Sequence, residues 1–338
     1  MKYSSAAALG PGRTIDAERL WSRVQTAFDA GQARVSVPLV TTQPSITRLS
    51  SSELQFDNLI AEGESRFAGS SGNRIHNINN GSRLIDGTVI PPGETFSFNA
   101  TVGPITEGNG FVEGLVIAPT RTEPGIGGGI CQVSTTLFRA AFWAGLPISE
   151  RWQHAYRVRY YELGPGNPPG FDAAIWQPAQ DLAFTNDTPN HILIRREFDA
   201  RRHRLTFRLM GPSLQRDVTL DAWKGEEIEP PPLRVEPTTE LPPGEIEKTD
   251  SAIPGLRTVI ARQVMLGGHV LFKDRFPSIF LPWAERWEVG QDEDGNFDPN
   301  LVPAYAEAQA EAEAEGESQD DSAPTEDSSA TEQNAGQT

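Results

Sequence analysis

The segment that decides the fold reads Gly127-Gly128-Gly129-Ile130-Cys131-Gln132-Val133-Ser134-Thr135-Thr136-Leu137 and stands near the middle of a 338-residue chain. Its glycines form a hinge. From Cys131 to Ala144, apolar side chains then recur at the spacing of one helix face, and Gly145 follows as a C-terminal cap. The segment therefore predicts a central amphipathic helix that begins at about Cys131.

Segments with strand character surround this helix. An aromatic strand is predicted at Thr95–Phe98, directly after the turn signal Pro92-Gly93. Residues 191–198 and 204–209 pair as a hairpin around a polar turn, and a further strand is predicted at residues 156–161. One central helix against antiparallel strands is an α+β fold.

The N-terminal part of the chain predicts simpler elements. Residues 14–30 show helical spacing of apolar side chains, and residues 33–40 alternate as a strand does. A helix and a strand are too little to fold alone, so we expect them to be the end of a longer module. Further on, the asparagines of Asn77–Gly81 predict turn or capping chemistry.

Composition and charge limit the class of protein. The chain contains 31 Gly and 27 Pro, which favours turns and β structure. Its net charge of −17 is uneven, because residues 291–338 hold 14 acidic side chains and no Lys or Arg. The rest of the chain holds 32 acidic and 29 basic residues and is therefore nearly neutral. Nucleic acid is thus not an expected partner. The acidic tail lacks an apolar stripe and is predicted to be disordered.

Cys131 is the chain's only cysteine, which excludes an intrachain disulfide and a cysteine-rich zinc site. A thiol at a helix N-terminus lies beside unpaired N–H groups and the positive end of the helix dipole, and both favour the thiolate. The glycines allow a substrate to approach the sulfur. The alternative is a small apolar side chain packed under a tight turn, which is the usual role of a free cysteine.

A set of ordered motifs across residues 65–212 resembles the VanW family, named after an accessory protein of vancomycin-resistance gene clusters. The motifs are Asn77-Ile78, Asn80-Gly81, Pro92–Asn99, Gly127–Leu137, Ala144-Gly145-Leu146, Glu150-Arg151, His154, Asp172-Ala173 and Asp181–Asn186. The resemblance implies a bacterial cell-envelope protein, without a settled biochemical activity, whose partner is peptidoglycan or its stem peptide. No export signal or anchor is visible in the chain as written.

The resemblance also divides the chain. Residues 1–52 are similar to the end of the peptidoglycan-binding module that often precedes VanW domains, and residues 53–213 form the VanW-like domain. Residues 214–290 resemble a small β-rich five-glycine domain, with an incomplete glycine pattern. Residues 291–338 are the acidic tail. The expected fold is thus an α+β domain followed by a β-rich domain and a disordered extension.

The segment around Cys131 is also similar to the nucleophile helix of transglutaminase-like thiol enzymes. Such enzymes need a histidine to exchange a proton with the thiol and a third group to orient that histidine. The similarity implies His154 as the base, with Asp172 or Asp181 as the orienting acid. His154 follows the cysteine sooner than in those enzymes, and no tryptophan stands directly after it.

Two functions remain open on the sequence. A non-catalytic wall-binding or scaffold role is favoured, with Arg151, Trp152, Gly128 and Gly129 as binding residues. The alternative is a Cys–His hydrolase or transpeptidase of cell-wall peptides. No cofactor is expected, and the other histidines lack the spacing of metal ligands. No apolar run reaches membrane-spanning length.

Overall fold

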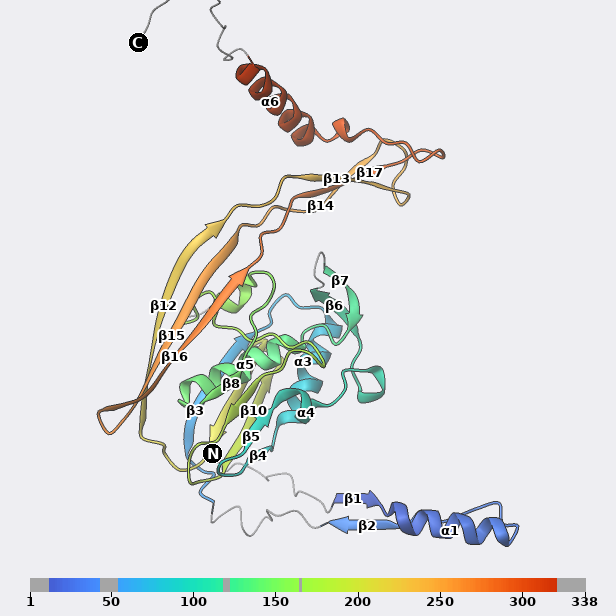
Figure 1. Cartoon of the computed structure of the whole chain (residues 1–338), viewed down its shortest axis with the longest axis vertical. Coiled ribbons are helices and arrows are strands. Elements are labelled where there is room, and N and C mark those ends of the chain that lie inside the picture. The colour runs from blue at the N-terminus through green and yellow to red at the C-terminus, as the bar shows by residue number, and fades with distance from the viewer. Residues whose placement is uncertain (1–11, 43–53, 118–121, 164–165, 321–338) are drawn as a thin grey trace, which may run out of the picture. The chain divides into compact units, whose positions relative to one another are not determined.

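The computed structural model describes residues 12–42, 54–117, 122–163 and 166–320 (Figure 1). This part of the chain combines helices with many sheets, which confirms the predicted α+β class. Contacts divide the chain into two compact units. The first runs to Glu226 and includes Arg257–Phe280, and the second comprises Glu227–Leu256 and the chain from Leu281. The division does not follow the predicted boundary at residue 214, because strands after that residue belong to both units.

The N-terminal segment is a helix between two paired strands. Strand β1 (Gly12–Ile15) pairs antiparallel with β2 (Leu39–Thr42), and helix α1 (Ala17–Asp29) lies between them in the chain. The helix starts at Ala17, later than predicted, because the Asp16 carboxylate caps it. This carboxylate accepts a hydrogen bond from the Arg19 backbone N–H. Most of the predicted strand at residues 33–40 is not a strand.

A four-stranded antiparallel sheet forms the centre of the first unit. Its strand order is β3 (Leu59–Arg66), β11 (Arg204–Met210), β10 (Ile192–Asp199) and β4 (Val89–Ile90). The hairpin of β10 and β11 confirms the one predicted from sequence. Helix α5 (Ile130–Trp143), labelled in Figure 1, packs on β3 and β11 and confirms the predicted central helix.

Helix α5 is buried on nearly every side. Val133 and Leu137 have no exposed surface. Opposite the helix, a Cβ atom on Gly63 would lie 2.3 Å from the carbonyl oxygen of Thr136 and 2.5 Å from the backbone nitrogen of Ala140. Glycine in strand β3 therefore allows the close approach of the helix backbone.

Shorter elements surround this core. They are helices α3 (Gly72–Ile85) and α4 (Phe98–Val102), the sheet of β5 (Thr95–Ser97), β9 (Ala183–Thr185) and β8 (Ile148–Glu150), the hairpin of β6 (Glu113–Ile117) and β7 (Thr122–Ile126), and the 3₁₀ turns η1 (Glu107–Asn109) and η2 (Arg159–Glu162). Two predictions are wrong here. Residues 156–161 form no strand and end in a 3₁₀ turn, and Asn77–Gly81 lies inside helix α3.

The remaining strands form two further sheets. The first has the order β12 (Arg216–Ile228), β15 (Gly255–Leu266) and β16 (His269–Phe280), with Gly267 and Gly268 in left-handed conformations at the tight turn between the last two. The second has the order β13 (Arg234–Thr238), β17 (Arg286–Gly290) and β14 (Ile246–Asp250).

Part of the predicted acidic tail is helical in the structure. After the 3₁₀ turn η3 (Pro299–Leu301), helix α6 covers Pro303–Asp320. Alanine and glutamate have high helix propensity, which accounts for a helix without an apolar stripe. Residues 321–338, also predicted as disordered tail, lie outside the described residues.

Candidate active site

Cys131 lies in the first turn of helix α5, directly after the glycine loop. Gly127 and Gly129 have φ angles of +90° and +108°, a region that favours glycine. The N–H groups of Ile130 and Gln132 bond back to carbonyl oxygens of this loop at 3.0 Å. The Cys131 N–H has no acceptor among the described residues, and its thiol is half-buried. Cys131 therefore combines a thiol and an unpaired N–H at a helix N-terminus.

Asn77, which was predicted to lie in a turn or cap, holds the glycine loop in place. Asn77, buried on α3, donates its side-chain amide to the Gly128 oxygen at 3.0 Å and to the Val112 oxygen at 2.9 Å. Its own oxygen accepts from the Val112 N–H at 2.9 Å. A Cβ on Gly128 would lie 2.6 Å from the Leu115 oxygen. Gly128 is thus packed inside the domain, which contradicts its predicted binding role, and for Gly129 that role stays a prediction.

His154 and Asp172 form the contact that the thiol-enzyme similarity implied. The buried His154 ring donates its Nδ1–H to the Asp172 carboxylate, and the His154 backbone N–H donates to the same oxygen at 3.1 Å. The other ring nitrogen remains for Cys131, and each of the two groups shifts the pKa of the other, as neighbouring side chains do. The structure therefore brings Cys131, His154 and Asp172 together in one connected group.

Helix α5 also holds the segment that carries the acid. The Thr135 hydroxyl donates to the Ala173 oxygen and accepts from the Ala173 N–H, both at 3.1 Å. The Cys131 Sγ lies 3.6 Å from the Ile175 oxygen. One helix thus supplies the thiol and positions the chain next to Asp172. No sequence pattern predicts this role for Thr135, because a threonine inside a helix has many ordinary uses.

Arg151 was predicted to bind substrate, and the structure corrects this. Its side chain is 3% exposed. Its guanidinium donates to the second Asp172 oxygen at 3.0 Å and to the Gly170 backbone oxygen at 2.7 Å. With these bonds Arg151 fixes the Asp172 carboxylate. Trp152, the neighbouring predicted binding residue, is 41% exposed and donates its ring N–H to Glu150 at 2.8 Å, so its binding role stays a prediction.

Asp181, the alternative orienting acid, has other partners. Its carboxylate accepts from the Ser97 hydroxyl, from the Asn99 N–H at 2.9 Å and from the Leu182 N–H at 2.8 Å. These bonds tie Asp181 to the start of helix α4. Of the two aspartates, Asp172 is the one in contact with His154.

The charges of the group favour a proton on the imidazole. Burial opposes the charged form of His154, but hydrogen bonds to Asp172 and Cys131 outweigh it and raise the pKa of His154 to about 9. Burial also opposes the Asp172 carboxylate, yet the bonds from His154 lower the pKa of Asp172 to about 2. For Cys131, burial is overcome by His154 and by the charge of Arg74, so the pKa of the thiol is lowered. Both shifts favour a thiolate beside an imidazolium.

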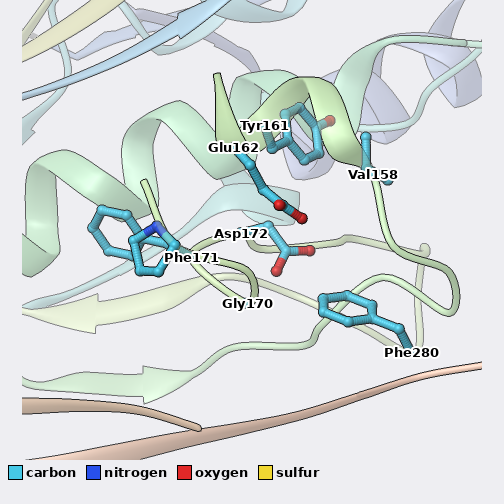
Figure 2. Close-up of a pocket in the computed structure, with 8 residues that line it drawn as sticks. Val158, Tyr161, Glu162, Gly170, Phe171, Asp172 and Phe280 are labelled. Atoms are coloured by element: carbon cyan, nitrogen blue, oxygen red, sulfur yellow. The ribbon is translucent and has the colours of Figure 1, made fainter. Parts of the chain in front are cut away.

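A small pocket reaches the acid end of this group. Figure 2 shows the Asp172 carboxylate with Glu162 and Phe280 on its two sides, and the pocket is also lined by Val158, Tyr161, Pro168, Gly170 and Phe171. Neither Cys131 nor His154 lines it. The pocket therefore does not contain the sulfur at which acyl chemistry would take place.

The described residues were compared with the requirements of a metal site and of a membrane-spanning helix. No group of three or more His, Cys, Asp or Glu side chains in residues 12–42, 54–117, 122–163 and 166–320 could hold a metal ion. In the same ranges, no helix has both the length and the apolar character needed to cross a bilayer.

Comparison with known proteins identifies the family of the segment that contains this site. Residues 73–210 match the family model described as "VanW like protein". Residues 73–210 belong to the VanW family. This stretch, hereafter the VanW domain, contains Cys131, His154 and Asp172. The match and the two relatives below support a cell-envelope protein.

Two curated bacterial proteins are similar to the chain. "Uncharacterized protein YoaR" of Bacillus subtilis (strain 168) is 35% identical over 168 residues, which are 50% of this chain and 53% of the relative. "Vancomycin B-type resistance protein VanW" of Enterococcus faecalis (strain ATCC 700802 / V583) is 32% identical over 116 residues, which are 34% of this chain and 42% of the relative. The chain thus spans about half the length of the curated relatives it matches.

Among solved structures, the chain is similar to "IgA1 Protease G5 domain structure", at 13% identity and a TM-score of 0.16, over 25% of this chain and 100% of that one. So low a TM-score carries no structural argument. The predicted domains on either side of the VanW domain, the end of a peptidoglycan-binding module and the five-glycine-like domain, stay predictions.

Proposed function

We propose that the VanW domain is a thiol acyl-transfer enzyme that acts on the peptide part of the bacterial cell wall. The observation that supports this most is the group in which His154 bonds to Asp172 and shares an electrostatic coupling with the Cys131 thiol, whose pKa it lowers. A cysteine with a purely structural role has no need of a charged histidine beside it. Nucleophile, base and orienting acid in contact are the arrangement that covalent acyl transfer requires.

The first half-reaction forms a thioester. The Cys131 thiolate attacks a peptide carbonyl carbon, and the carbonyl oxygen takes the electron pair. When the tetrahedral intermediate collapses, the C–N bond breaks and the leaving amine takes a proton from the His154 imidazolium. The products are an acyl-thioester on Cys131, a free amine and a neutral imidazole.

The unpaired N–H of Cys131 gives this step electrostatic support. It lies at the positive end of helix α5 and has no other acceptor among the described residues. A backbone N–H beside the nucleophile can donate a hydrogen bond to the oxyanion that forms on attack, without reorganisation of the site. We assign it that role.

The second half-reaction releases the acyl group. Water or the amine of a second peptide attacks the thioester, and His154 takes the proton of the attacking group. The C–S bond breaks, and the departing thiolate and the imidazolium restore the starting pair. Water as acceptor makes the domain a hydrolase, and an amine makes it a transpeptidase. The cell-wall substrate rests on the family relationship alone.

The test uses the full chain and synthetic muropeptides. We expect wild type to shorten or cross-link them, with a mass increase on Cys131 that matches a thioester, and we expect Cys131→Ala and His154→Gln to do neither. A wild type without turnover, whose thiol reacts with iodoacetamide no faster than free cysteine near neutral pH, would overturn the proposal.

A second function, non-catalytic binding to the wall, is favoured by exposed aromatic side chains. The exposed fractions are 36% for Trp143, 41% for Trp152, 56% for Trp176 and 41% for Tyr160. Exposed aromatic rings suit sugar faces and peptide anchors. Retention on purified peptidoglycan by wild type and by Cys131→Ala, and its loss in Trp152→Ala and Trp176→Ala, would favour this role. No retention of wild type at modest salt would count against it.

A further inference from the structure

Arg74 is a cation fixed beside the candidate nucleophile. It lies in the first turn of helix α3, where its backbone N–H donates to the Ser71 hydroxyl. Its guanidinium donates to Gln132, the neighbour of Cys131, at 2.8 Å and to the Tyr160 hydroxyl at 2.8 Å. A third bond reaches the Ser70 hydroxyl at 3.0 Å. These bonds hold the guanidinium in one place next to the active helix.

The other arginines near the site are engaged in ways that Arg74 is not. Arg151 is bound to Asp172, and Arg157 is bound to Glu162 at 2.7 Å. Arg139 is almost fully buried and donates to three backbone carbonyls. Arg74 is half-exposed and has no acidic partner within 4.0 Å in the described part of the chain. Its positive charge is therefore available to a ligand.

Arg74 also keeps hydrogen-bond donors for such a ligand. A guanidinium has about five N–H donors in a planar fork that suits a carboxylate. Three hydrogen bonds to protein atoms use part of them, and no bond to its Nε occurs among the described residues. A partner with two oxygens can therefore be bound without breaking the bonds that position the side chain.

The surroundings of Arg74 add to the attraction for an anion. Helices α3 and α5 both begin next to it, since a Cβ on Gly129, the residue before α5, would lie 2.9 Å from the Arg74 Cγ. Helix N-termini favour negative charge. The charge of Arg74 also helps to lower the pKa of the Cys131 thiol, so it acts at the position of the sulfur.

We propose that Arg74 binds a carboxylate of the acyl donor beside Cys131. This inference rests on the proposed function and names its substrate class: peptides that carry a free carboxylate close to the carbonyl that the thiolate attacks. Gln132 and Tyr160 are positioning residues that hold the guanidinium. Amidated or esterified peptides of the same sequence are poor donors.

A pair of alkylating reagents tests the proposal on the full chain, because Cys131 is its only thiol. Iodoacetate and iodoacetamide both form an S–CH₂ bond with the thiolate and release iodide, but only the first carries a carboxylate. The readout is the ratio of their rate constants, divided by the same ratio for a small neutral thiol. A change in the thiol pKa alters both rates equally, so the ratio isolates carboxylate binding.

We expect the normalised ratio of the iodoacetate rate to the iodoacetamide rate to be about ten for wild type, as a charge-assisted hydrogen bond implies. Arg74→Gln should return it to about one, and Tyr160→Phe should lower it in part. Arg83→Gln removes the same charge from the other end of α3 and should leave the ratio unchanged. Arg74→Lys, which keeps the charge, serves if Arg74→Gln does not fold.

The outcomes separate this proposal from the proposed function. Fast alkylation of Cys131 by both reagents, with the same ratio in wild type and Arg74→Gln, overturns the role of Arg74 and leaves the thiol enzyme standing. A Cys131 that reacts with neither reagent faster than the free thiol overturns the proposed function, and the role of Arg74 falls with it. With muropeptides, a free carboxylate and its amide should differ in KM in wild type but not in Arg74→Gln.

Discussion

One carboxylate oxygen of Asp172 accepts hydrogen bonds from both the ring and the backbone N–H of His154. The two bonds fix the imidazole in position and in tautomer, so that its other nitrogen is directed to the Cys131 thiol. The second Asp172 oxygen is bound by Arg151, which prevents the carboxylate from rotating. The geometry of the proposed catalytic group is thus determined from its acid side.

Replacing Asp172 by Asn should therefore make Cys131 less reactive. The loss of the carboxylate removes the interaction that raises the pKa of His154, so the imidazole loses its proton at lower pH and no longer stabilises the thiolate. The rate of iodoacetamide alkylation at pH 7 should fall at least about tenfold, which corresponds to about 1.4 kcal/mol. The measurement is mass-spectrometric labelling of Cys131 over time.

Asp181→Asn is the matched control for this change. It removes a carboxylate of the same kind that is bonded to Ser97 and Asn99 and not to His154. Its effect should be on stability, with the alkylation rate near that of wild type. Equal rates in the two variants would contradict the assignment of Asp172.

The pH dependence of turnover and of alkylation should differ at alkaline pH. His154 keeps its proton up to about pH 9, so acyl transfer should fall as the pH rises through that value, because the leaving amine no longer receives a proton. Alkylation needs only the thiolate and should not fall there. On the acid side both rates should fall when the Cys131 thiolate is protonated. This fall should occur at a pH below the ordinary thiol pKa of about 8.5, because the pKa of Cys131 is lowered. Parallel loss of both rates near pH 9 would contradict this.

The same shifts set the pH dependence of stability. Because the pKa of His154 is higher in the folded state, protonated His154 stabilises the fold. This contribution is complete below about pH 6.5, the pKa in the unfolded state, and is lost as the pH rises through about 9. The lowered pKa of Asp172 stabilises the fold above its unfolded value of about 3.9 and is lost as the pH falls towards 2. Urea unfolding of wild type and His154→Gln across this range should show the first effect as a difference that disappears above about pH 9.

Gly129→Ala should damage both stability and the site. Alanine is strained at a φ of +108°, and its Cβ would lie 2.9 Å from the Arg74 Cγ and 3.1 Å from the Ile78 Cγ1. We expect a loss of about 2–4 kcal/mol in the free energy of unfolding and slower alkylation of Cys131. Gly69→Ala separates the two causes, because Gly69 has a φ of +79° and no heavy atom within 4 Å of the added Cβ. It should cost about 1–2 kcal/mol and leave alkylation unchanged.

Arg262 on strand β15 stabilises the C-terminal end of helix α5. Its side chain is fully buried and donates to the backbone oxygens of Phe142 and Leu146 at 3.0 Å, and to Asp274. Arg262→Met should lower the free energy of unfolding by about 2–4 kcal/mol, because the Phe142 and Leu146 carbonyls and the Asp274 carboxylate lose their partner. The exposed Arg275→Met on β16 should change it by less than about 0.5 kcal/mol. Similar urea midpoints for both variants would contradict this.

Local patterns predicted the elements that depend on local residues. The helix after the glycine loop and the hairpin of β10 and β11 follow from apolar periodicity and from turn residues, and both are present. The prediction failed for Asn77–Gly81. Inside a helix an asparagine is unfavourable on propensity alone. The Asn77 side chain, however, satisfies one backbone group of Gly128 and two of Val112, and no local pattern contains those partners.

The sequence by itself determined Cys131 as the candidate nucleophile, since a lone thiol at a helix start is a local feature, and a family resemblance brought in His154. The choice between Asp172 and Asp181, the burial of Arg151 behind the acid and the placing of Arg74 beside the thiol were decided by tertiary structure alone. The physical reason is that hydrogen bonds and burial join residues from separate elements. Spacing along the chain carries no record of which carboxylate the folded backbone presents to the imidazole.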